Sequence, residues 1–176
     1  MFLLCQISPS MQQWFAAWPR LVDARGYVGL ISHILGHGSW EHVIGNFMLI
    51  LLIGPILEER HGSVRLLILI VLTAVLTGLL HAALSDGLMI GSSGIAFMMI
   101  LLASMVNVRS GEIPLTFLAV AAIHTNGELV RLFRSDGIAH SAHLIGGAAG
   151  AIFGFLGAQP RLALPTTPAK RQLATR

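Results

Sequence analysis

Five stretches of this chain carry no charged side chain, and most are long enough to cross a membrane as helices. These uncharged runs are residues 42–57, 66–85, 87–108, 113–127 and 137–160. A helix needs about 20 mostly apolar residues to span a bilayer, with a range of about 17–25. Charged residues make up only 11% of the 176-residue chain, whereas a soluble domain carries about 25%. We therefore predict an all-α, polytopic membrane helix bundle with five transmembrane helices.

The two ends of the chain differ from this apolar core. We predict that residues 1–40 form an N-terminal stub and an interfacial loop, because Trp14 and Trp18 suit the membrane interface. Residues 41–158 form the transmembrane core, and residues 159–176 form a basic, disordered tail. The net charge of +3 comes without a basic patch that contains interleaved aromatic residues, so we expect no nucleic-acid partner.

The basic residues predict the orientation of the helices in the membrane. Seven Lys and Arg residues follow the first, third and fifth spans, and four lie on the opposite side. Since cytoplasmic loops are enriched in Lys and Arg, we predict a multi-pass protein of the cell membrane with a cytoplasmic C-terminus. The first, third and fifth spans then begin at the outer face. His42, Ser93 and His143 lie near those beginnings, within the outer third of the membrane.

Four polar residues lie in these apolar spans, where the bilayer makes them costly: His42, Asn46, Ser93 and His143. Ser93 belongs to the loop-to-helix junction Gly91–Gly94, whose free N–H groups suit an oxyanion. A serine can act as a nucleophile and a histidine as its base. Since no carboxylate shares the depth of His143, we interpret the pair as a Ser–His dyad. His42 and Asn46 are spaced i,i+4 on one helix face, from which both can donate to an oxyanion.

Small residues predict how the dyad is assembled. Glycines recur at positions 146, 150 and 154 of the last span, and such a face lets another helix approach to backbone contact. We predict that the helix beginning at Ser93 packs there, which brings its hydroxyl to the imidazole of His143.

Other interpretations of the same residues remain open. Ser92 and Ser93 can simply cap a helix, and His143 can be a hydrogen-bonded core residue. His33 and His37 are spaced i,i+4, as zinc ligands on a helix can be, but no HExxH motif accompanies them, and we expect no metal. The histidines are also compatible with a small multi-pass transporter that uses them as a proton or metal relay.

The motifs together resemble those of the rhomboid family of intramembrane serine proteases. Residues His33–Asn46 (HILGHGSWEHVIGN) resemble the family's HxxxHxxxxHxxxN stretch, and residues 54–63 (GPILEERHGS) resemble the segment that closes its second helix. Gly91–Gly94 matches the GxSG motif, and Ala142–Gly146 matches AHxxG. The four motifs occur in the family's order over residues 33–157.

This resemblance implies a role for each matching position. Ser93 would be the nucleophile and His143 the base. The oxyanion site would comprise the side chains of His42 and Asn46 with the backbone N–H groups of Ser92 and Ser93. Supporting positions would be Phe97, against the catalytic histidine, and the glycines Gly91, Gly94 and Gly146.

The resemblance also implies a substrate class and a scaffold. The activity would be a serine endopeptidase that cleaves single-pass transmembrane proteins near the outer membrane face, without a cofactor, beneath a mobile cap formed by residues 126–137. The family core has six spans, so we expect the first family helix to be missing or truncated to a stub at Met1–Cys5. The alternative is an inactive rhomboid-like protein that binds membrane clients, although a binder has no use for all four polar residues.

Overall fold

The protein is described from a computed structural model that covers residues 9–105, 113, 115–131 and 140–157. The predicted stub at Met1–Cys5, the tail 159–176 and the cap residues 132–137 lie outside the described residues. Within the described residues the regular elements are all helical, which confirms the all-α part of the predicted fold class. They are α2 (Pro9–Gln12), η1 (Gln13–Phe15), α3 (Ala24–Ser32), η2 (His33–Leu35), α4 (Trp40–His61), α5 (Ser63–Leu84), α6 (Ser93–Ser104), α7 (Leu115–Arg131) and α8 (His140–Gly157).

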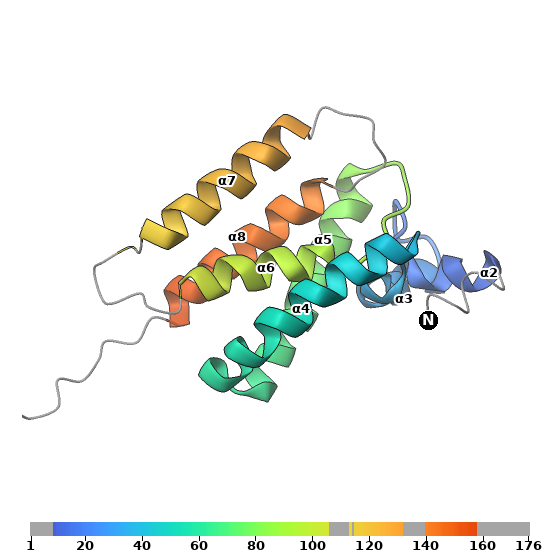
Figure 1. Cartoon of the computed structure of the whole chain (residues 1–176). Helices are drawn as coiled ribbons and strands as arrows, with labels where there is room; N and C mark the ends of the chain where they lie inside the picture. Colours follow the sequence, from blue (N-terminus) through green and yellow to red (C-terminus); the bar gives the residue numbers. More distant parts are fainter. Residues whose placement is uncertain (1–8, 106–112, 114, 132–139, 158–176) are drawn as a thin grey trace, which may run out of the picture.

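Helix α6 is the central element of the bundle (Figure 1). It packs most extensively against α8 and also contacts α4, α5 and α7, while α7 lies against α8 (Figure 1). The largest buried side chains of α6 are Met98, Met99 and Leu102, which join Leu57 of α4 in the main apolar core. Because α6 touches four neighbours, a residue at its first turn can meet groups from several helices.

Helix ends are set by local chemistry. Asp23 caps α3 through a carboxylate that accepts from the N–H groups of Arg25 and Gly26, and the Ser39 hydroxyl accepts from the His42 N–H at the start of α4. Helices α4 and α5 are joined at Gly62, whose φ of 81° lies in the region that favours glycine. A tight turn therefore sends α5 back alongside α4.

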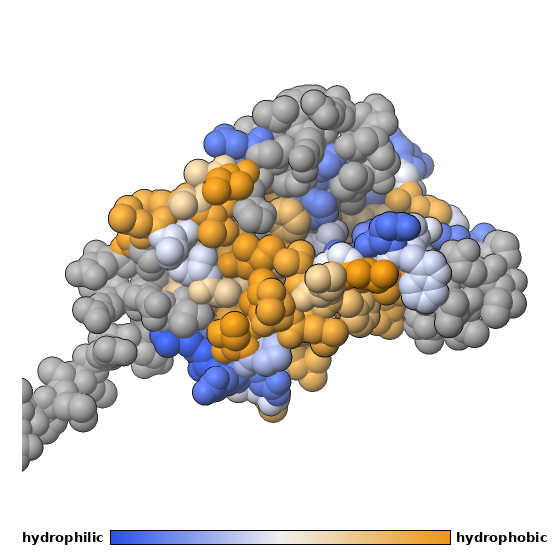
Figure 2. Space-filling model, in the orientation of Figure 1, coloured by the Kyte–Doolittle hydropathy of each residue, from blue (hydrophilic) through white to orange (hydrophobic). Residues whose placement is uncertain are grey.

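Two of the described helices, α4 and α5, are long and apolar enough to cross a membrane. Helix α6 is apolar but has only 12 residues, because the chain enters it through an irregular segment in which Gly91 has a φ of 117°. The predicted count of five spans therefore stays a prediction. Figure 2 shows a broad apolar band over the middle of one face, and α4 contributes exposed side chains such as Leu51 and Leu52.

The segment before α4 contains more structure than the predicted interfacial loop. Helix α3 packs against α5, and a Cβ placed at Gly29 would overlap the Ala16 carbonyl. Backbone hydrogen bonds join Ala17 and Met89 in both directions, at 2.8 and 3.0 Å, and the Gly91 N–H donates to the His33 carbonyl at 2.9 Å. The N-terminal segment thus holds the loop that leads into α6.

Candidate active site

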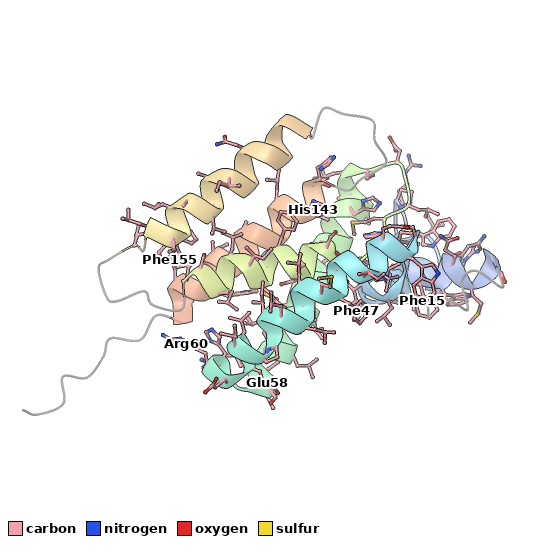
Figure 3. The ribbon with its side chains drawn as sticks, in the orientation of Figure 1. Phe15, Phe47, Glu58, Arg60, His143 and Phe155 are labelled. Carbon is pink, nitrogen blue, oxygen red and sulfur yellow. The ribbon has the colours of Figure 1, made fainter. Side chains whose placement is uncertain are left out.

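The structure brings Ser93 and His143 into direct contact. The Ser93 hydroxyl lies 2.7 Å from His143 Nε2, a hydrogen-bond distance. Ser93 is the first residue of α6, and His143 lies one turn into α8. Figure 3 shows His143 well away from Glu58 and Arg60, which lie in the last turns of α4. The two side chains therefore meet, and their roles as nucleophile and base stay a prediction.

Glycines on α8 make this contact possible. A Cβ added at Gly146 would overlap the Gly94 backbone, and one added at Gly150 would overlap the Met98 carbonyl. A Cβ at Gly154 would lie 2.6 Å from the sulfur of Met105. The predicted glycine face is therefore the surface on which α6 packs, and it brings the two backbones close enough for the dyad to form.

Aromatic rings surround the imidazole of His143. The ring of Phe97 stacks on it, with centroids 4.4 Å apart and planes inclined by 7°, as predicted for this position. The ring of His140 meets it edge to face at 6.0 Å and is buried. The i,i+3 spacing of the two histidines is the one signal in the sequence for this last contact. Together the two rings restrict the orientations open to the imidazole.

The loop residue Gly91 lies against His42 and Asn46. A Cβ at Gly91 would stand 2.6 Å from the His42 ring and 3.6 Å from Asn46 Nδ2, so only glycine can occupy this position without displacing its neighbours. Asn46 is buried and His42 is partly exposed. The two predicted oxyanion donors therefore lie beside the backbone that leads into Ser93.

The beginning of α6 has backbone N–H groups that point out of the helix. Ser92 occupies the N-cap position but makes no side-chain capping bond, and the first intrahelical bond runs from Ala96 N–H to the Ser92 carbonyl. Ser92 thus stands at the cap position without capping the helix through its side chain. N–H groups of the first turn have no partner within the helix, and the helix dipole adds positive potential at the same place.

The two histidines before α4, His33 and His37, contact other groups of the protein. His33 is buried, with Nδ1 2.9 Å from the Gly29 carbonyl and Nε2 3.4 Å from the Thr77 hydroxyl. Burial lowers its pKa to about 4, against a weaker opposing effect of the Gly29 bond. In the described part of the chain no three His, Cys, Asp or Glu side chains are grouped to hold a metal ion. His37 contacts Asn46 and Ser92 instead.

The sequence matches the Rhomboid domain over residues 24–160. The chain belongs to the rhomboid family. This rhomboid is 27% identical to the Rhomboid protease GlpG of Haemophilus influenzae over 135 residues, which cover 74% of this chain and 70% of that protein. The matched region begins at the first residue of α3 and ends beyond α8, so it contains every residue of the site described above.

Proposed function

We propose that this rhomboid is an intramembrane serine endopeptidase. The observation that supports the proposal most directly is the hydrogen bond of 2.7 Å between Ser93 Oγ and His143 Nε2, because a nucleophile needs a base within this distance. Ser93 attacks the scissile carbonyl carbon while His143 accepts its proton. The bond to the leaving amine breaks as His143 returns that proton to the nitrogen. Water, deprotonated by His143, then releases the acyl group and regenerates Ser93.

The oxyanion of each tetrahedral intermediate is held by donors from two elements. The N–H groups of Ser92 and Ser93 come from the start of α6, and the side chains of His42 and Asn46 come from α4. Gly91 allows these two sets to approach each other, since its lack of a side chain leaves room for the His42 ring. Removing one oxyanion donor costs about 10²–10³-fold in rate in enzymes that use such a site.

The substrates we propose are single-pass transmembrane proteins, cut near the outer membrane face in a lipid environment. This assignment is supported by family membership and by the apolar helices α4 and α5. It also requires a cytoplasmic C-terminus and several spans, as the distribution of basic residues predicts. No cofactor takes part in the proposed reaction.

The test is cleavage of a transmembrane substrate in liposomes, together with labelling by a fluorophosphonate probe. Ser93→Ala and His143→Ala are each expected to abolish cleavage, and Ser93→Ala to abolish labelling. Ser104→Ala is the matched serine control, since Ser104 lies at the other end of the same helix and its hydroxyl donates to the Leu101 carbonyl. His61→Ala is the matched histidine control. Cleavage by either purified dyad variant contradicts the proposal.

The alternative function is an inactive membrane client binder. Wild-type protein that is folded in detergent yet takes up no probe and cuts no substrate supports this alternative. A transporter, by contrast, is expected to tolerate Ser93→Ala, because its relay depends on histidines alone.

A further inference from the structure

His37 is a buried histidine that the proposed reaction does not use. It lies between η2 and α4, and only 2% of its surface is exposed. Its Nε2 stands 3.2 Å from Asn46 Nδ2 and 3.5 Å from Ser92 Oγ, while its Nδ1 stands 3.4 Å from the Leu35 carbonyl. One imidazole therefore contacts a proposed oxyanion donor and the residue that precedes the nucleophile.

A single tautomer satisfies all of these contacts. The Leu35 carbonyl can only accept, so Nδ1 must carry the proton and donate to it. Nε2 is then the acceptor, and it receives an N–H of the Asn46 amide and the longer O–H bond of Ser92. Burial lowers the pKa of His37. The bond to the Leu35 carbonyl opposes this effect, and the nearby His42 adds to it. The lowered pKa favours the neutral ring that this arrangement requires.

The contact between His37 Nε2 and Asn46 decides which way the Asn46 amide faces. An amide has two N–H donors on one side and an acceptor oxygen on the other. If the amide were reversed, its oxygen would meet the lone pair of Nε2. With one N–H bound to His37, the other N–H is left to donate elsewhere, and the oxygen is turned away from Nε2.

We propose that His37 is a positioning residue that orients the Asn46 amide so that its second N–H faces the oxyanion. The inference rests on the proposed function, because it assigns Asn46 as an oxyanion donor. The Ser92 hydroxyl adds a second, weaker tie between His37 and the start of α6. His37 thus links the two elements that supply the oxyanion donors, and it acts on the reaction only through them.

The first test compares two substitutions at this position. His37→Phe keeps a ring beside His42, which His37 meets edge to face at 5.0 Å, but it provides no acceptor. His37→Gln retains an oxygen that can accept near the place of Nε2. We expect His37→Phe to lower kcat by about 10–100-fold with little change in KM. This loss is smaller than that from removing an oxyanion donor altogether, because Asn46 is still present but no longer held in place. We expect His37→Gln to recover most of that kcat.

A double-mutant cycle separates positioning from a structural role. In the Asn46→Ala background His37→Phe is expected to lower kcat by less than about 2-fold, since the group it orients is gone. A full, multiplicative loss in that background overturns the inference. So does a His37→Gln variant that is folded and as slow as His37→Phe.

A second measurement needs no turnover. Nitrogen-15 NMR of histidine-labelled protein, with the His37 signals assigned by their loss in His37→Gln, reports which ring nitrogen carries the proton. We expect the Nδ1–H tautomer and a change in the Nε2 signal in Asn46→Ala. An Nε2–H tautomer overturns the inference even if wild-type protein is active. If wild-type protein cleaves nothing, the proposed protease function fails, while the NMR result still decides whether His37 accepts from Asn46.

Discussion

The contact between Gly146 and the Gly94 backbone gives a quantitative test of how the dyad is assembled. Gly146→Ala introduces a methyl group where the Gly94 carbonyl already lies. Gly147→Ala introduces the same group one residue later, where it would stand 3.7 and 3.8 Å from Leu101 carbons, at ordinary contact distance. Both variants gain the same helix propensity, about 1 kcal/mol. The difference between their free energies of unfolding is therefore the cost of overpacking at Gly146 alone, about 1–3 kcal/mol.

The methyl group at position 146 should also push α6 and α8 apart and separate Ser93 from His143. If α6 and α8 separate by on the order of 1 Å, Ser93 Oγ moves from 2.7 Å to beyond hydrogen-bond reach of His143 Nε2. A misplacement of about 1 Å costs roughly 10²-fold in rate. The assays are thermal unfolding in detergent and cleavage of a transmembrane substrate in liposomes. If Gly146→Ala matches Gly147→Ala in both assays, the close approach of α6 and α8 does not position the dyad.

Three further changes test other parts of the structure. Gly91→Ala places a Cβ 2.6 Å from the His42 ring on a residue whose φ is 117°. We expect the rate of cleavage to fall about 100-fold or more, while the circular dichroism spectrum keeps its helical signal. Cleavage by this variant at the wild-type rate would refute the expectation. Asp23→Ala removes the α3 cap and should lower the unfolding temperature, whereas Asp23→Asn, which still caps, should lower it less. Equal unfolding temperatures for the two variants would contradict the capping role. Burial lowers the pKa of His33 from 6.5 to about 4, so on acidification His33 is protonated in the unfolded chain before it is protonated in the folded one. The folded state therefore loses stability as pH falls from about 6.5 to about 4, by up to roughly 3 kcal/mol. Denaturant titrations of wild type and His33→Gln check this, and an equally steep pH dependence in the variant would count against it.

The sequence predicted the parts of the site that follow from helix periodicity. Glycines spaced by four residues implied a helix packed at backbone distance, and the structure places α6 there with Ser93 against His143. The contact of Phe97 with the imidazole came from the resemblance to rhomboids, and it too is present.

The parts that the sequence did not predict depend on irregular backbone. The partners of His37 follow from the path of the chain between η2 and α4 and from the unusual φ of Gly91. Neither has a periodic signature. For this reason two alternatives stayed open in the sequence, His37 as a zinc ligand and Ser92 as a simple helix cap, and the approach of their side chains to 3.5 Å was not predicted. The number of spans also stayed undetermined, since an uncharged run does not reveal where a loop ends inside it.

The backbone bonds that join Ala17 to Met89 and Gly91 to His33 have an evolutionary consequence. They use no side-chain atoms, so most substitutions at Ala17 and Met89 leave the hydrogen bonding itself intact. The position of the loop before the nucleophile can therefore persist while its sequence drifts between relatives. Proline is the exception, because it has no N–H to donate. At Ala17 and Met89, which are also buried, the absence of proline among relatives would be the trace of selection on these bonds.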